Sequence, residues 1–554
     1  MNGSYTEATL KFLKLNTQAQ QREAVVQGRS LSPYQLRYNG IQLSGVKIMT
    51  YILAHDLGTS GNKATLFSEQ GELVASCTVS YSTHYFNRVW AEQDPDDWWK
   101  AVCESTQQLL AQSKIDSCQV AVVVLSGQMM GATCVDRQGN PLRPSIIYCD
   151  QRSEKEAADI LSGISMEDAY KIIGHRIAAV YPLAKLLWVK NNEPEVFKKT
   201  FKTICAKDYI NFRLTGIIAT DYSDASGTNA FDLAGKCWSD IMIDVSGVDG
   251  SIFPDVFPST HVLGELTGGA ALATGLRAGT LVCCGGGDGA CATVGVGSVR
   301  PGSAYHYLGS SGWIGLTTER PIFDKNMRTM TWAHCVPDYY HPSGSVQTAG
   351  AAYNWLKEQI CTAESAKAAD KNENVYDVMN ELLLQSPIGA NGLLFLPYLL
   401  GERSPRWNSN ARGAFIGLTL TSRRCDMIRS VMEGITYNFA IIVDIFREHV
   451  QFDTMTVIGG GAKGQVWLQM MADIFGTKIQ RPNFLEEATS IGAAIVGGVG
   501  AGIFKDFSIV GQFLRTEETL NPIPQNEKAY QKIRPLFDKA YHSLVELFDD
   551  LREI

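Results

Sequence analysis

Residues 54–63, AHDLGTSGNK, follow a short apolar stretch and lead into the strand-like residues ATLF. The segment places an acid, Asp56, two glycines and two hydroxyls where a strand is expected to turn. Glycine lets a ligand approach the main chain, and successive N–H groups and hydroxyls in such a turn form a cradle for anionic oxygens. Asp56 would repel a phosphate in that cradle unless a cation lay between them. The alternative is a β-hairpin with an Asx-type turn, and one glycine-rich turn does not decide between the two.

The chain has 554 residues, too many for one hydrophobic core, so two domains or a large two-lobed body are expected. Apolar residues make up 45% and charged residues 19%, which is typical of a soluble globular protein. The formal net charge of −8 argues against nucleic acid as a partner, and no apolar run is long enough to span a membrane. The 13 cysteines are scattered without a Cys-x-x-Cys motif. This favours reduced, packing cysteines in a cytoplasmic protein over disulfides or a zinc site.

Residues 1–48 differ from the rest of the chain in composition. They are rich in Gln, Thr and Ser, contain few acids, and lack the apolar core of a secretory signal. Such a composition faintly suits an organellar transit peptide. However, Met49 opens the stretch MTYILAHDLG, which reads as a natural start. We therefore expect residues 1–48 to be an accessory or disordered leader, and we assign them no function.

Strand and helix patterns alternate along the remaining chain. DPDDWWKAVCESTQQLLAQS begins with Asp94 as an N-cap and Pro95 at the first helical position. TLVCCGGGDGACATVGVG reads as a strand, a glycine turn and a small-residue helix, and TMTVIGGGAKGQVWLQMMADIFG repeats this scheme. In the second segment Trp467, Met470, Met471 and Ile474 have helical spacing and are expected in the core. The alternation predicts an α/β architecture with largely buried sheets.

A weak internal repeat bears on the opening segment. LGTSGNKATLF at 57–67 is echoed by LGSSGWIGLTT at 308–318, and both read Leu-Gly-hydroxyl-Ser-Gly followed by strand-like residues. A duplicated domain that closes on one nucleotide needs two such phosphate hairpins, one in each half. The repeat therefore favours a nucleotide phosphate clamp over two unrelated turns.

From Tyr51 to about residue 545 the sequence resembles the FGGY carbohydrate kinases. GAFIGLTLTSRRCDMIRSVMEG at 413–434 fits the family's C-terminal signature, and YPLAKLLWVKNN at 181–192 resembles its N-terminal one. AEQDPDDWW, SDASGTNAFDL and GERSPRWNSNARGAFIGL look most like xylulokinases, with gluconokinases next. The resemblance implies a two-domain ribonuclease H-like/actin-like ATPase fold with an ATP cleft between the domains. The expected boundaries are 49–299 for the N-terminal domain and 300–554 for the C-terminal domain.

The resemblance also implies roles for two acids. In this family the Asp of the GGGD segment, here Asp288, is the general base of phosphoryl transfer. From its surroundings alone, an N-cap role for Asp288 would be the stronger interpretation. Asp56 resembles the acid that orients Mg²⁺ near the β- and γ-phosphates of ATP, and oxygen ligands suit this hard cation. The residues expected to contact phosphate are Thr59, Ser60 and Lys63 in the first hairpin and Gly309 and Ser310 in the second.

For the nucleoside of ATP the resemblance implies two segments. Gly350, Asn354 and Trp355 border the adenosine, although Trp355 suits a plain core position nearly as well. Gly460 and Gly461 lie above a helix N-terminus, where N–H groups favour an anion or a polar ribose edge. Gln465 stands where relatives hold an amide that contacts the base, and a solvated helix position is the alternative.

The expected sugar pocket departs from the xylulokinase pattern at three positions. Met130 in GQMMGA replaces a histidine that hydrogen-bonds the sugar. Gly289 stands where xylulokinases hold Asn and gluconokinases hold Gly, and Tyr148 stands where Trp is usual. These changes put D-xylulose itself in doubt, since a hydrogen-bonding site discriminates by its polar groups. The residues placed near the sugar are Gln128, Met129, Met130, Asp150, Asp288 and Gly289.

We therefore expect an ATP- and Mg²⁺-dependent kinase of a small sugar or polyol, xylulokinase-like first and gluconokinase or another polyol kinase second. Two other classes stay open. One is a nucleotide switch of the actin/Hsp70 type, which needs no sugar base, and the other is a sugar sensor without catalysis. Asp56, Asp288 and both hairpins argue against these two. The sequence leaves open whether the protein forms a homodimer.

Overall fold

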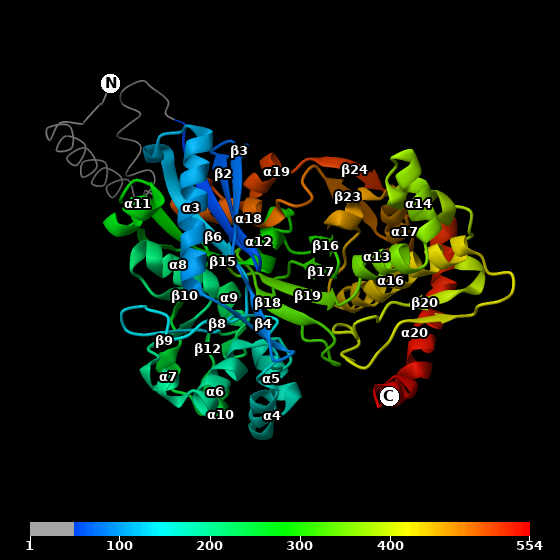
Figure 1. The fold of residues 1–554 in the computed structure, drawn as a ribbon, viewed down its shortest axis with the longest axis horizontal. Helices are drawn as coiled ribbons and strands as arrows, with labels where there is room; N and C mark the ends of the chain where they lie inside the picture. Colours follow the sequence, from blue (N-terminus) through cyan, green and yellow to red (C-terminus); the bar gives the residue numbers. More distant parts are fainter. Residues whose placement is uncertain (1–48, 554) are drawn as a thin grey trace.

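The computed structural model describes residues 49–553, and the expected leader, residues 1–48, lies outside them. Two large mixed sheets, each covered by helices, form the two halves of the molecule (Figure 1). The first sheet has the strand order β14-β15-β6-β1-β2-β3. Its strands are β1 Tyr51–Leu57, β2 Gly61–Ser68, β3 Leu73–Ser80, β6 Val120–Gly127, β14 Val262–Glu265 and β15 Leu281–Gly287.

The second sheet has the order β18-β19-β17-β16-β22-β23-β24. Its strands are β16 Ala304–Leu308, β17 Gly312–Leu316, β18 Met330–Ala333, β19 Tyr340–Val346, β22 Thr454–Ile458, β23 Lys478–Pro482 and β24 Thr516–Leu520. Each sheet contains an antiparallel hairpin, β1–β2 or β16–β17, whose first strand is also parallel to a later strand, β6 or β22. The sheets thus share one topology, in line with the internal repeat of the sequence.

Alternate residues of the first sheet face two separate hydrophobic layers, as the two-residue period of a strand requires. Leu53 and Leu57 of β1 face the layer that contains α3 Pro95–Ser113, α8 Ala206–Thr215 and α11 Gly268–Thr274. Ile52 and Ala54 face the opposite layer, built from α12 Asp288–Gly295 and α18 Ala488–Ala501. The whole of β6 is buried, as the run VAVVVLSG predicts.

Helices also cover the second sheet, and further small elements complete the fold. The main helices there are α13 Gly350–Gln359, α14 Thr362–Lys371, α15 Val375–Leu383, α16 Arg424–Arg447, α17 Gln465–Phe475 and α20 Pro524–Arg552. A third helical layer comprises α4 Glu154–Gly163, α5 Met166–Ile173, α6 Pro182–Asn192, α7 Pro194–Lys199 and α10 Asp240–Ser246. The remaining elements include β4 His84–Phe86, β5 Trp90–Gln93, β7 Thr133–Val135, β8 Ser145–Ile146, β9 Lys202–Ile204, β10 Ala219–Asp221, α9 Tyr222–Ser226, β11 Phe231–Asp232, β12 Cys237–Trp238, β13 Asp255–Phe257, β20 Leu394–Leu396, β21 Ala414–Ile416 and α19 Val510–Phe513.

Two segments from the second half of the sequence return to the first half of the molecule. Helix α18 packs on the first sheet, where Figure 1 shows it among β6, β15 and α12. Strand β18 is the second segment: the N–H of Thr331 donates to the Gly174 carbonyl at 2.9 Å, and the N–H of Ala333 donates to Ser226 Oγ at 3.1 Å. The two halves are therefore tied together by α18 and by the hydrogen bonds of β18.

Several local predictions are confirmed. Asp94 caps α3 and accepts from the Asp96 N–H, with Pro95 at the first helical position. Both strand–glycine–helix units form, β15–α12 and β22–α17, and the four α17 side chains with helical spacing are buried. All 13 cysteines are unpaired thiols, as expected. Between residues 49 and 553, we find no helix that has both the length and the apolarity to cross a bilayer.

Candidate active site

The carboxyl ends of three adjacent parallel strands, β1, β6 and β15, meet at one edge of the first sheet. In β1 and β6, Asp56 is paired with Ser126, and in β6 and β15, Gly127 is paired with Gly287. Asp56 and Asp288 therefore lie on either side of the end of β6. The edge of an open α/β sheet formed by the carboxyl ends of its strands is where such proteins bind ligands.

Asp288 is the first residue of α12 and is exposed to the cleft. Its Oδ1 accepts from the N–H of the next residue, Gly289, at 2.7 Å. A helix cap instead accepts from an N–H two or three residues further on. The capping position of α12 is Gly287. Asp288 is therefore not the N-cap of this helix. Although water reaches the carboxyl, surrounding protein atoms displace much of its hydration and raise its pKa to about 6, against the opposing effect of the Gly289 N–H.

Asp56 carries a second perturbed carboxyl. Burial and, second, the charge of Asp288 raise its pKa to about 7, against the opposing effects of Lys63 and Ser126. Lys63 is the cross-strand partner of Asp56 and also lies 3.8 Å from Glu487. The edge of the sheet therefore holds more negative than positive charge. This excess of carboxylate oxygen fits a hard cation such as Mg²⁺.

In the turn of the first hairpin the carbonyls accept hydrogen bonds, whereas two N–H groups have no acceptor among the described residues. The Thr59 carbonyl accepts from Gln93 Nε2 at 2.6 Å and from Thr83 Oγ1 at 3.1 Å, and the Gly58 carbonyl accepts from the Tyr81 hydroxyl. Within residues 49–553, the N–H groups of Thr59 and Ser60 have no acceptor. Unpaired N–H groups beside a hydroxyl are what an anionic oxygen needs.

In the second hairpin the turn carbonyls are also hydrogen-bonded, here by N–H groups at the start of α13. The N–H groups of Ala349 and Ala351 donate to the Ser310 carbonyl, and the N–H of Gly350 donates to the Gly309 carbonyl at 2.9 Å. A Cβ at position 350 would lie 2.5 Å from that carbonyl oxygen, so only glycine allows this approach. Within the described part of the chain the Ser310 N–H has no acceptor. Gly350 therefore supports the hairpin.

A cavity of about 330 Å³ lies beside the second hairpin. It is lined by Ala292, Tyr307, Trp313, Ile458, Gly459, Gly460, Leu485, Glu486, Ala488 and Thr489. A Cβ at Gly460 would meet open space, whereas one at Gly461 would lie 2.2 Å from Leu308, so Gly460 faces the cavity and Gly461 is packed. The sequence did not single out Tyr307 and Trp313, whose ring centroids stack 4.1 Å apart. The two residues pair across the second hairpin, and this pairing is the signal that could have identified them.

The other residues expected near the adenosine lie elsewhere. Gln465 is exposed, donates to Glu518 at 2.8 Å and lines a different cavity. Asn354 donates to Glu358 and accepts from the Tyr376 hydroxyl, and Trp355 stacks on Phe395. In this structure the side chains of Gln465, Asn354 and Trp355 thus contact other protein side chains, and their roles at the adenosine stay predictions.

The residues expected near the sugar gather at the end of β6. A Cβ at Gly287 would lie 2.5 Å from Met129, so Met129 packs directly against the turn that carries Asp288. Met130 has a positive φ of 60°, and its carbonyl accepts from Lys185 Nζ at 2.8 Å. Gln128 donates to Gln93 Oε1 at 2.6 Å, while its own Oε1 is buried without a partner in the described residues.

Three further positions of the expected sugar pocket are Asp150, Gly289 and Tyr148. Asp150 is completely buried, and its carboxylate accepts from Arg152 and from the Ala91 N–H, which indicates a supporting position. A Cβ at Gly289 would have no neighbour within 4 Å, so this departure leaves open space next to Asp288. Tyr148 is 36% exposed.

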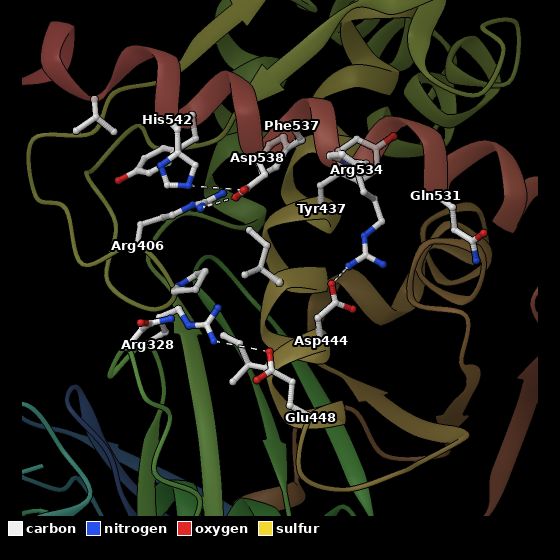
Figure 2. A pocket seen from close by; sticks show the side chains of 17 residues that line it. Arg328, Arg406, Tyr437, Asp444, Glu448, Gln531, Arg534, Phe537, Asp538 and His542 are labelled. Carbon is white, nitrogen blue, oxygen red and sulfur yellow. Dashed lines mark hydrogen bonds and ion pairs between the residues drawn. The ribbon is translucent and has the colours of Figure 1, made fainter. Parts of the chain in front are cut away.

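A cavity of about 800 Å³ lies between α16 and α20, and none of the predicted site residues lines it. Figure 2 shows its three arginines, each facing a carboxylate: Arg328 with Glu448, Arg406 with Asp538, and Arg534 with Asp444. The guanidinium charges are therefore neutralised by the protein. We place the candidate active site at the Asp56–Asp288 edge, where unpaired N–H groups and perturbed carboxyls coincide.

The family of the chain follows from comparison with known proteins. The N-terminal domain model of the FGGY family of carbohydrate kinases matches residues 51–295, and the C-terminal domain model matches residues 304–501. The chain belongs to the FGGY family of carbohydrate kinases. This confirms the resemblance drawn from the sequence, and the chain is an ATP-dependent carbohydrate kinase with the two-domain, actin-like α/β fold.

Curated relatives include enzymes for two different sugars. The xylulose kinase of Staphylococcus xylosus is 32% identical over 89% of this chain and 100% of its own length. The gluconokinase of Bacillus subtilis is 29% identical over 88% of this chain and 95% of its own. The solved structure of ligand-bound xylulose kinase from Lactobacillus acidophilus has a TM-score of 0.84 at 28% identity, and covers 91% of this chain and 100% of that one. The family thus accounts for sugar phosphorylation but leaves the sugar unassigned.

Proposed function

We propose that this kinase transfers the γ-phosphoryl group of ATP to a hydroxyl of a pentulose such as D-xylulose. Asp288 is the general base in this proposal. The observation that carries it is the exposed Asp288 carboxyl at the end of β15, with a pKa of about 6 and open space beside it at Gly289. A carboxyl with this pKa is ionised at neutral pH, yet basic enough to accept a proton from a reacting hydroxyl.

The reaction needs three contributions from the chain. The free N–H groups of Thr59, Ser60 and Ser310 bind phosphate oxygens of ATP from two sides and align the γ-phosphorus with the sugar hydroxyl. Asp288 accepts the hydroxyl proton as the new O–P bond forms and the bond to ADP breaks. Asp56 would hold Mg²⁺, which when bound would supply positive charge to neutralise the phosphates.

D-Xylulose is our first choice because the xylulose kinase relatives match the chain over nearly their whole length. Gluconate is the second choice, and Gly289 favours it, since gluconokinases also hold glycine after the base. We also propose a cytoplasmic location, which the unpaired thiols support.

A substrate screen tests the proposal. Pentuloses, hexuloses, aldonates and polyols are each supplied with MgATP, and ADP release is measured. We expect the highest kcat/KM with a pentulose. A preference for gluconate would replace the first choice by the second, and ADP release independent of any added sugar would contradict the proposal in both forms.

A further inference from the structure

A cluster of buried charges lies behind the turn that carries Asp288, and no step of the proposed reaction uses it. Lys207 Nζ lies 2.6 Å from Asp208 Oδ1, 3.1 Å from Asp221 Oδ1 and 3.2 Å from Asp224 Oδ2. None of these four side chains is more than 1% exposed. The Lys207 ammonium thus occupies the centre of the carboxylates. Buried charges persist when they are paired, and Lys207 pairs with Asp208 and Asp221; we call these three residues the anchor. Asp224 is held less well: burial raises its pKa well above the usual range, and neither of its carboxyl oxygens has a hydrogen-bond partner among residues 49–553.

One hydroxyl connects the anchor to the active site. Ser223 Oγ donates to Asp221 Oδ2 at 2.6 Å and accepts from the Gly287 N–H at 2.9 Å. Gly287 immediately precedes Asp288, so Ser223 is bonded to the Gly286–Gly287 peptide unit, one residue before the one that carries the candidate base. Ser223 is completely buried. A Cβ at Gly286 would lie 3.1 Å from its Oγ, which shows how closely the glycine turn approaches the hydroxyl.

The direction of these hydrogen bonds is fixed. Asp221 Oδ2 also accepts from the Ser223 N–H at 2.9 Å and from Ser259 Oγ at 2.6 Å. The Ser223 proton is therefore committed to the carboxylate, and a lone pair of Ser223 Oγ is left for the Gly287 N–H. Lys207 holds Asp221 in turn. The chain Lys207–Asp221–Ser223–Gly287 sets the position of the N-terminus of α12.

We propose that Ser223 is a positioning residue for Asp288, acting through the Gly287 N–H and held in place by Asp221 and Lys207. The inference rests on the proposed role of Asp288 as general base. Loss of the Ser223 hydroxyl leaves a buried N–H without a partner and frees the turn to shift. A misplacement of about 1 Å at a reacting group costs up to about 100-fold in rate.

Ser259 provides a matched control. Its hydroxyl donates to the same oxygen, Asp221 Oδ2, at the same distance of 2.6 Å, and its side chain is 1% exposed. Ser259→Ala therefore removes an equally short, equally buried hydrogen bond from the anchor but keeps the bond between Ser223 and Gly287. If the two hydroxyls have only a structural role, Ser223→Ala and Ser259→Ala should have equal kcat values.

The experiment compares kcat, the KM values for ATP and sugar, and the melting temperature of the two variants. We expect Ser223→Ala to lower the melting temperature more than Ser259→Ala, because it removes two hydrogen bonds and leaves the Gly287 N–H without a partner. Ser223→Ala should lower kcat by about tenfold with both KM values within about twofold, whereas Ser259→Ala should keep kcat within about twofold. Equal kcat values in the two variants would overturn the inference. If Ser223→Ala does not fold, Ser223→Cys takes its place with the same expectations, because a thiol is a weak acceptor.

Asp288→Asn, measured in the same assay, separates the inference from the function on which it rests. Full turnover in Asp288→Asn would overturn the proposed base and the positioning role with it. Lost turnover in Asp288→Asn, together with equal kcat values in Ser223→Ala and Ser259→Ala, would overturn only the positioning role.

Discussion

Met130, the residue that replaces the histidine of xylulokinases, adopts a left-handed backbone conformation with φ of 60°. Among non-glycine residues, histidine is several-fold enriched at positive φ, so the backbone at this position accommodates a histidine. We therefore expect a histidine at position 130 to cause little backbone strain.

Met130→His is expected to improve selectivity for D-xylulose over other polyols by about 1 kcal/mol, a typical hydrogen-bond contribution. The ratio of kcat/KM values checks this, with the melting temperature as a control that should not change. If the ratio does not move toward D-xylulose, Met130 does not line the sugar site.

Lys185 on α6 is completely buried and donates to the carbonyls of Met130 and Ile147, both at 2.8 Å. Burial lowers its pKa from 10.5 to about 7, with Asp150 acting in the opposite direction. Because the folded-state pKa lies below the unfolded one, Lys185 contributes stability that is present above pH 10.5 and lost as the pH falls through about 7.

Lys185→Met removes this titration. The free energy of unfolding of the wild type, minus that of the variant, should therefore grow between pH 7 and 10 by on the order of 1 kcal/mol per pH unit. Denaturant titrations of both proteins without ligand measure this difference. A difference that does not depend on pH would show that Lys185 keeps its charge in the folded protein.

At the scale of elements, the two hairpins are the features that the sequence predicted most directly. Their turns differ in what supports them. Side chains from β5 and its surroundings hold the first hairpin, whereas N–H groups at the start of α13 hold the second. Both arrangements leave turn N–H groups without an acceptor among residues 49–553.

If both hairpins bind the same nucleotide, Thr59→Val and Ser310→Ala should be non-additive. Residues that share a ligand typically couple by more than about 0.5 kcal/mol, and a double-mutant cycle on kcat/KM for ATP measures this coupling. Both substitutions keep the N–H groups and remove only hydroxyls, so strict additivity would mean that the Thr59 and Ser310 hydroxyls do not act on one ligand.

The sequence predicted elements whose pattern is local. The strand–glycine–helix units and the buried face of α17 follow from periodicity and from glycine placement. Contacts between distant segments were not predictable: Gln93 lies 34 positions from the Thr59 carbonyl it bonds, and nothing in a single sequence links the two. Two local contacts also became apparent only in the structure: the ion pair of Asp150 with Arg152, and the stack of Tyr307 on Trp313 across the second hairpin.

At the scale of the whole molecule, the crossing of α12 and α18 joins the half that carries Asp288 to a helix from the end of the chain. Two glycines allow the crossing. A Cβ at Gly295 would lie 1.7 Å from the Ala488 carbonyl oxygen, and one at Gly492 would lie 1.8 Å from that of Cys291.

Gly492→Ala is therefore expected to destabilise the protein by about 3 kcal/mol, at the upper end of typical overpacking costs. Gly268→Ala is the matched control, since a Cβ at the start of α11 meets nothing within 4 Å. Thermal unfolding compares the two variants. Equal stability of the two would show that the crossing adapts to an extra methyl group.

The most direct test of the central claim, that Asp288 is the general base of this kinase, is the turnover of Asp288→Asn on the best substrate from the screen. The substitution keeps the size of the side chain and removes the base. We predict a loss of sugar phosphorylation of about 10²–10⁴-fold, with an unchanged melting temperature and little change in MgATP affinity. Near-wild-type turnover in a folded, MgATP-binding variant would contradict the account.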